Sequence, residues 1–200
     1  AWEGLRVMSK TGCRPFCSTR NGLVQGEGSA IFVLEDYDYA KQRGAHIFAE
    51  ILGCSMTSDG TDLVSPSLNG VKKAMFKSLN SAKINPDSID YINAHGTSTP
   101  VGDLAELSAI KAVFGKKAPV IGSTKSMTGH SLGATGAQEA IYSILMMQHD
   151  FMAPSINIHN LVEEAEGLNI CQSMMEKKLN AVMSNSFGFG GTNASLIFSK

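Results

Sequence analysis

The chain has 200 residues, 43% of them hydrophobic and 18% charged, with a formal net charge of −1. A chain of this length and composition can bury a core, and it fits one domain or one domain with an extra piece. The near-zero net charge provides no bulk attraction to nucleic acid or to an anionic membrane surface, and the apolar runs are too short to span a bilayer. We therefore expect neither a nucleic acid nor a membrane as a partner.

The N-terminal residues show no signal-peptide pattern and no initiator methionine, so we expect a fragment or a processed product. The chain has four cysteines: Cys13, Cys17, Cys54 and Cys171. Only the first two are close in sequence, and no second pair follows at zinc-finger spacing. We expect free thiols in a reducing compartment, which together with the missing signal favours the cytoplasm.

Apolar periodicity, glycines and prolines divide the chain into alternating strands and helices. Residues 1–9 are expected to be the end of a helix. Thr99 followed by Pro100 predicts the start of another, because threonine is a good N-cap and proline suits the first helical position. The predicted strands cover residues 30–34, 47–54, 89–92, 120–121, 181–184 and 194–198. The predicted helices cover residues 36–44, 71–82, 100–114 and a segment after His130 that includes 137–145. This alternation predicts an α/β fold.

Two glycine-rich segments carry further expectations. The glycines of segment 22–28 are spaced for tight turns or for close approach of two backbones. Segment 185–193 reads as the turn of an antiparallel hairpin, in which Phe187 and Phe189 point the same way and one of them lines an apolar pocket. A phosphate-binding nest is the other interpretation of this turn. A P-loop or dinucleotide site is excluded, because no helix follows the turn.

Two of the five histidines stand among small and hydroxyl-bearing residues at predicted element ends. His95 follows strand 89–92, and His130 lies five residues after Lys125. A strand end that presents a histidine into a crevice is where open α/β sheets place their chemistry. We therefore regard both as candidate functional residues. The other histidines are read as structural or surface residues: His46, His149 and His159.

The sequence neighbours of the charged residues near these histidines indicate the role of each charge. Glu139 is an acid within an apolar, alanine-rich helix, and a buried carboxylate is costly unless it is paired, so a contact with Lys125 is expected. Asp103 and Glu106 are read as a solvated helix face or as acids that stabilise the helix start.

A metal site and a hydrolase site are the two alternatives at these residues. Neither His95 nor His130 has a carboxylate or cysteine at ligand spacing, so no metal site is predicted. Residues 129–133 match the G-x-S-x-G nucleophile elbow of α/β-hydrolases, with Ser131 as the nucleophile. The residues before this motif are polar and poor strand formers, which leaves the hydrolase as a distant alternative.

Three segments, in this order and at this spacing, resemble the β-ketoacyl-acyl-carrier-protein synthases: residues 93–103, 124–134 and 185–193. These are elongating condensing enzymes of type I/II, and the resemblance runs from about Trp2 to Lys200. It implies a thiolase-like α/β fold, layered αβαβα in the whole enzyme. Residues 1–45 would be the end of the N-terminal half with a lead-in, and residues 46–200 the C-terminal half.

The resemblance also implies roles for individual residues. His95 and His130 match the two catalytic histidines, which donate hydrogen bonds to a thioester oxygen and so stabilise an enolate. Lys125 matches the lysine that supports the second histidine, and Glu139 its acidic partner. Two threonines and two phenylalanines match residues around the phosphopantetheine arm and the gate beside the nucleophile: Thr97, Thr99, Phe187 and Phe189.

The implied reaction is a decarboxylative Claisen condensation of an acyl thioester with malonyl-carrier protein, in fatty-acid or related lipid biosynthesis. No resident cofactor is implied, since phosphopantetheine arrives on the acyl carrier protein. The implied partners are that carrier protein, the N-terminal half of the enzyme and a second copy in a homodimer. None of the four cysteines sits in the small-residue turn that would activate a nucleophile, so we expect this chain alone to be inactive. The alternative is a non-catalytic, chain-length-setting partner of a heterodimer.

Overall fold

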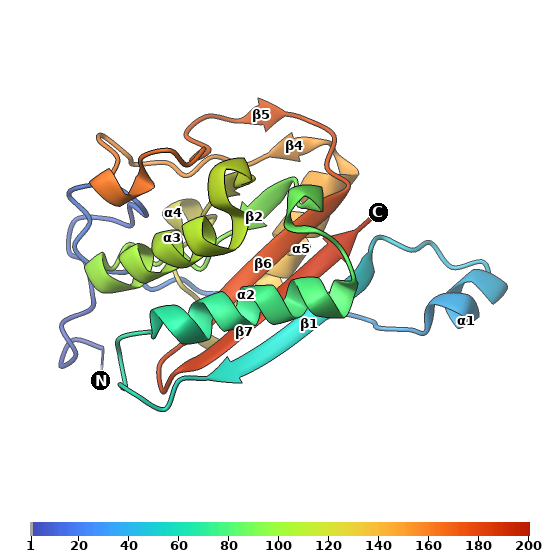
Figure 1. Ribbon diagram of the computed structural model, residues 1–200, viewed down its shortest axis with the longest axis horizontal. Coiled ribbons are helices and arrows are strands. Elements are labelled where there is room, and N and C mark those ends of the chain that lie inside the picture. The colour runs from blue at the N-terminus through green and yellow to red at the C-terminus, as the bar shows by residue number, and fades with distance from the viewer. Residues whose placement is uncertain (1) are drawn as a thin grey trace.

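A computed structural model describes residues 2–200 and contains a mixed five-stranded sheet with helices on both faces (Figure 1). The strand order is β1-β7-β6-β2-β3. These strands are β1 (Glu50–Ser58), β2 (Tyr91–Asn93), β3 (Val120–Gly122), β6 (Ala181–Gly188) and β7 (Thr192–Ser199). β2 runs parallel to both β3 and β6, whereas β7 runs antiparallel to β6 and β1. The predicted α/β class and the predicted C-terminal hairpin are confirmed.

The helices form a layer on each side of this sheet. Figure 1 shows α2 and α3 in front of the sheet and α5 behind it. The helices are α1 (Tyr37–Gln42), α2 (Leu68–Ala82), α3 (Pro100–Phe114), α4 (Lys125–Thr128) and α5 (Thr135–Gln148). Single 3-10 turns cover Pro86–Ser88, Gly115–Lys117, Leu132–Ala134 and Glu163–Ala165. A separate antiparallel pair consists of β4 (Phe151–Met152) and β5 (Met175–Glu176).

The central strands are buried on both faces because a helical layer covers each. In β2, Ile92 belongs to the core under α2 and α3, whereas the preceding Tyr91 belongs to the core under α5. Their partners on β6, Met183 and Val182, divide in the same way. Removal of each such side chain from water contributes on the order of 1.5–3 kcal/mol, so the two cores fix the strands against both layers.

The helix predicted from Thr99 and Pro100 is confirmed, since α3 begins at Pro100 with Thr99 as its N-cap and ends before Gly115. Helix α1 is confirmed as well. The strand predicted at 89–92 is shifted to β2, and that at 47–54 to β1. All four cysteines are free thiols. Within residues 2–200, every helix falls short of the length and apolar character that crossing a bilayer requires.

Two predictions near the N-terminus are wrong. Residues 30–34 form no strand, and the side chains of Ile31 and Val33 are 89% and 85% exposed. No strand among residues 2–200 lies beside this segment to satisfy its backbone. The helix expected in residues 1–9 also fails where the structure describes it, because Val7 and Ser9 bond to the backbone of Leu23 instead.

Candidate active site

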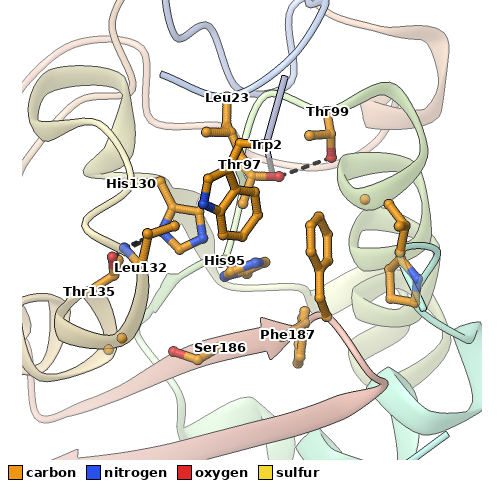
Figure 2. A pocket seen from close by; sticks show the side chains of 17 residues that line it. Trp2, Leu23, His95, Thr97, Thr99, His130, Leu132, Thr135, Ser186 and Phe187 are labelled. Atoms are coloured by element: carbon orange, nitrogen blue, oxygen red, sulfur yellow. Dashed lines mark hydrogen bonds between the residues drawn. The ribbon is translucent and has the colours of Figure 1, made fainter. Parts of the chain in front are cut away.

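The parallel arrangement of β2, β3 and β6 brings the predicted site residues together. Because the carboxyl ends of parallel strands meet at one edge of a sheet, the segments that follow them converge there. His95 stands two residues beyond β2, α4 with Lys125 follows β3, and Phe187 lies at the end of β6. A pocket of about 440 Å³ opens at this edge, and Figure 2 shows His95 and His130 pointing into it.

A buried carboxylate of α3 holds the loop that carries His95. The Glu106 side chain is 1% exposed, and its two oxygens accept hydrogen bonds from the backbone N–H groups of His95 at 2.9 Å and of Gly96 at 2.8 Å. The side-chain amide of Asn185 donates a third bond at 3.2 Å. Burial raises the pKa of Glu106, and the donated hydrogen bonds oppose that rise. Glu106 therefore fixes the backbone from which the His95 ring projects.

Asp103, one turn earlier on α3, holds the next part of the same loop. Its carboxylate accepts the backbone N–H groups of Ser98 at 3.0 Å and of Phe16 at 2.9 Å, and Arg20 lies 3.5 Å away. Burial raises the pKa of Asp103 to about 7 in spite of these donors. Ser98 has a φ of 68°, a left-handed conformation that costs energy for a non-glycine residue. The carboxylate compensates for that conformation by satisfying the buried N–H.

The interpretation of Asp103 and Glu106 as a solvated helix face is wrong, since both are buried and neither is exposed by more than 1%. Asp103 does lie in the first turn of α3, as the helix-stabilising interpretation requires. Two acids three residues apart on a helix are typical of an exposed face. The sequence nevertheless contains a pattern that indicates burial of these two acids. Asp103 and Glu106 share the face of α3 that carries Leu107 and Ile110, which marks that face as interior.

His130 is held by its own loop and by the N-terminal lead-in. Its Nδ1 accepts a hydrogen bond from the backbone N–H of Leu132 at 3.2 Å, with the Thr135 hydroxyl at 2.9 Å. Because Nδ1 is an acceptor, the neutral ring carries its proton on Nε2. The His130 backbone N–H bonds to Val24 and its carbonyl accepts from Gly26. A Cβ at Gly26 would stand 2.3 Å from a backbone oxygen, which confirms the predicted close approach.

Both imidazoles are neutral near pH 7. The two rings lie 5.4 Å apart between centroids, nearly perpendicular to each other. Burial lowers the pKa of His130 to about 4, and the Lys125 ammonium adds to that effect. Burial, Lys125 and His130 together hold the pKa of His95 well below its ordinary value. The Nδ1 of His95 is buried and has no hydrogen-bond partner within residues 2–200.

The predicted contact between Lys125 and Glu139 is present. The Lys125 Nζ lies 2.5 Å from Glu139 Oε1, and both side chains are buried, at 0% and 1% exposure. Neither residue lines the pocket. Burial raises the pKa of Glu139 while the ammonium lowers it, so the pair is held against a large desolvation cost. Lys125 acts on the two histidines electrostatically, because its ammonium group lowers the pKa of each.

The remaining predicted residues line the pocket. The hydroxyl oxygens of Thr97 and Thr99 lie 2.9 Å apart. Figure 2 shows these two side chains at the pocket, joined by a hydrogen bond. Phe187 packs against His95 with ring centroids 5.7 Å apart. Phe189 is 36% exposed and lies 5.1 Å from the ring of Trp2, a pocket residue that the sequence pattern did not indicate. Both Phe187 and Phe189 line the pocket, whereas the spacing predicted a common direction with one of them at a pocket.

Within residues 2–200 the pocket lacks the cysteine that the implied condensation requires, and it lacks the features that the hydrolase and metal alternatives require. The residues that line it include no cysteine. The strand that a nucleophile elbow needs before Gly129 is replaced by helix α4, and the buried Ser131 hydroxyl has no partner among residues 2–200. No group of three His, Cys, Asp or Glu side chains within that range has the arrangement of a metal site.

Comparison with known proteins agrees with this geometry. Residues 48–159 match the family of the β-ketoacyl synthase C-terminal domain. The chain is 54% identical to 3-oxoacyl-[acyl-carrier-protein] synthase 1 of Escherichia coli K12 over 187 residues, which are 94% of this chain and 45% of that protein. The chain thus spans about half the length of the curated relatives it matches.

Solved structures give the same result. A β-ketoacyl synthase from Burkholderia phymatum superimposes with a TM-score of 0.96 at 41% identity, over 100% of this chain and 50% of the other. A chain from the structure of a type II PKS acyl-carrier protein in complex with its ketosynthase also matches. Its TM-score is 0.95 at 30% identity, over 99% of this chain and 51% of the other. The fold is the thiolase-like fold of ketosynthases, and the chain belongs to the β-ketoacyl synthase family, whose C-terminal domain it carries.

Proposed function

We propose that the enzyme containing this chain is a β-ketoacyl-acyl-carrier-protein synthase, and that this chain supplies its two catalytic histidines. The observation that carries the proposal is the His95–His130 pair, two neutral imidazoles 5.4 Å apart that line one pocket. The name of the E. coli relative, a 3-oxoacyl-[acyl-carrier-protein] synthase, supports the same reaction.

In this reaction, the bond between the malonyl carboxylate and the α-carbon breaks, and CO₂ leaves. The electron pair forms an enolate on the malonyl thioester, whose oxygen accepts hydrogen bonds from His95 and His130. The α-carbon then attacks the carbonyl of an acyl group held on a cysteine as a thioester. A carbon–carbon bond forms, and the cysteine leaves as a thiolate. The product is a 3-oxoacyl thioester, and no external oxidant or reductant enters.

Neutral histidines suit this role. A neutral imidazole with its proton on Nε2, as the bonds to Nδ1 of His130 require, donates a hydrogen bond without itself losing a proton. The low polarity of the buried site strengthens that bond as negative charge develops on the oxygen. Lys125 contributes by opposing protonation of both rings. Lys125 and Glu139 are therefore positioning residues in this proposal.

The substrate reaches the histidines through the pocket. Thr97 and Thr99 present two hydroxyl groups along its wall, where they would bond to the polar groups of a phosphopantetheine arm. Phe189, in the turn after β6, would gate the approach to the acyl cysteine, with Phe187 behind it. The arm arrives on an acyl carrier protein, and the ketosynthase–carrier complex among the matched structures supports that partner.

The nucleophilic cysteine belongs to the N-terminal half of the enzyme, because the pocket in this chain has none. In this proposal residues 1–45 are the end of that half and residues 46–200 the C-terminal half. The exposed Ile31 and Val33 would then be covered by strands of the N-terminal half. A second copy would complete a homodimer. The retained histidines favour a catalytic subunit over a chain-length-setting partner.

The test is a reconstituted condensation with the full-length enzyme, an acyl thioester and malonyl-carrier protein. The expected result is 3-oxoacyl-carrier protein with one CO₂ released for each product; absence of both would overturn the proposal. A second measurement concerns this chain alone. After incubation with acyl thioester, mass spectrometry should find no cysteinyl-acyl adduct on it, and an adduct would show that the nucleophile is misassigned.

A further inference from the structure

Thr135, the first residue of α5, bonds directly to the ring of His130. Its hydroxyl oxygen lies 2.9 Å from Nδ1 of the imidazole, and Figure 2 shows the two side chains joined by a hydrogen bond. Thr135 is 4% exposed and lines the pocket. Its hydroxyl therefore lies within the site, behind one of the two histidines.

The usual reason for a threonine at the start of a helix does not apply to Thr135. Threonine stabilises a helix start from the N-cap position, where its oxygen accepts a backbone N–H. The N-cap of α5 is Ala134, which has no side-chain oxygen, and Thr135 is the residue after it. Within residues 2–200 the hydrogen-bond partner of the Thr135 hydroxyl is His130 Nδ1. Stability of the helix start therefore does not explain this hydroxyl.

The direction of the bond follows from a second contact of the same ring nitrogen. The backbone N–H of Leu132 lies 3.2 Å from His130 Nδ1 and can only donate, so Nδ1 carries no proton. A hydroxyl can donate or accept, whereas a ring nitrogen without a proton can only accept. The Thr135 hydroxyl therefore donates. Two donors meet at one lone pair, and the contact of Thr135 is the shorter one.

His95 has no comparable support at its ring. Its Nδ1 is buried and has no hydrogen-bond partner within residues 2–200. Glu106 holds His95 through its backbone N–H, whereas Thr135 holds His130 at the imidazole itself. The two histidines are therefore not equivalent, since bonds to Nδ1 fix the position of the proton in His130 alone.

We infer that Thr135 is a positioning residue that fixes the proton of His130 on Nε2 and strengthens Nε2–H as a donor. This inference rests on the proposed function, in which that group donates to the enolate oxygen. Linked hydrogen bonds polarise one another, so a bond donated to Nδ1 makes the opposite N–H a stronger donor as negative charge develops on the oxygen. A proton on Nδ1 would face the Leu132 N–H, which cannot accept it, so the arrangement also opposes the imidazolium form.

The hydroxyl can be removed without changing the charges around His130. Lys125 of α4 lowers the pKa of His130, and His95 faces it from the loop after β2, with 5.4 Å between ring centroids. Glu139 is the acid on α5, and it pairs with Lys125. Threonine and valine have the same shape and no charge, so their exchange tests the hydroxyl itself.

The experiment uses variants of the full-length enzyme that separate the hydroxyl from the shape of the side chain. Thr135→Val keeps the shape and removes the hydroxyl, Thr135→Ala removes both, and Thr135→Ser keeps the hydroxyl. The matched control is Thr128→Val, whose hydroxyl bonds to the backbone carbonyls of Thr124 and Gly129 instead of a ring. CO₂ release from malonyl-carrier protein gives kcat and KM, and ¹⁵N NMR of labelled histidine gives the tautomer and the pKa of His130.

Thr135→Val and Thr135→Ala should each lower kcat about fivefold and leave KM within about twofold, while Thr135→Ser and the control keep the unmutated kcat within about twofold. Loss of the hydroxyl should also raise the pKa of His130, because the neutral ring loses a donor. An unmutated kcat or an unmutated pKa in both variants without a hydroxyl would overturn the inference, and so would a serine variant as slow as the alanine variant. If the unmutated enzyme releases no CO₂, the proposed function fails, and the pKa of His130 in the variants still decides whether Thr135 acts on its ring.

Discussion

Glu106→Gln tests whether the buried acids of α3 position His95. Glutamine has the same shape but only one oxygen, so one of the two backbone N–H groups now bonded to separate carboxylate oxygens would face an amide NH₂. A buried donor without a partner costs about 1–3 kcal/mol, and the remaining bonds lose roughly 1 kcal/mol through loss of the charge. Removing a desolvated charge offsets part of this loss, as the raised pKa of Glu106 indicates. We expect a net loss of about 2 kcal/mol in the free energy of unfolding.

The same substitution should affect catalysis more than binding. A shift of the His95 backbone misaligns its ring, and misplacement by about 1 Å can cost about 100-fold in rate. The assays are urea denaturation and CO₂ release from malonyl-carrier protein, both with the full-length enzyme. Glu163→Gln, at an exposed acid, is the control and should change stability by less than about 0.5 kcal/mol. If Glu106→Gln behaved like that control in both assays, the positioning role of Glu106 would be refuted.

Four further predictions concern Lys125, His130 and Thr97. Lys125→Met should lower the free energy of unfolding by about 3–5 kcal/mol, because the buried Glu139 carboxylate loses its cation. The double variant Lys125→Met/Glu139→Leu should restore most of this loss. A double variant that is no more stable than the single one would contradict the pairing. His130, with its pKa lowered to about 4, should show the neutral Nε2–H tautomer by ¹⁵N NMR at pH 6, and an imidazolium there would be contrary to the structure. As the pH falls, the His130 side chain takes up a proton in the unfolded chain before it does so in the folded one. His130 should therefore lower the free energy of unfolding between pH 6.5 and about pH 4, and His130→Ala should remove this contribution. Thr97→Val should raise the KM for the carrier thioester several-fold with little change in stability; an unaltered KM would argue against contact with the arm.

The pocket could be predicted from the sequence because its residues lie in short segments with local signals. His95 and Phe187 each mark a strand end, and His130 sits among glycines and hydroxyl residues. Such segments depend on neighbours in sequence, so their conformation follows from local pattern. Their convergence followed from the parallel strands, whose carboxyl ends share one edge.

The errors concern residues whose environment is set by distant parts of the chain. The hydrogen-bond partners of Asp103 include the backbone N–H of Phe16, which lies 87 positions away, and that of Ser98. Residues 30–34 have strand composition, but a strand needs a neighbour to satisfy its backbone, and no such neighbour lies among residues 2–200. Trp2 lies at the pocket through a long-range contact with Phe189. Periodicity contains no information about such partners.

The measurement that tests the proposed chemistry most directly is CO₂ release from malonyl-carrier protein by the full-length enzyme carrying His95→Ala. His149→Ala, at an exposed histidine, is the matched control. Loss of one preorganised donor to the enolate oxygen should lower the decarboxylation rate by about 10²–10³-fold, while the control keeps the unmutated rate. An unchanged rate in a folded His95→Ala enzyme would contradict the assignment of the histidine pair.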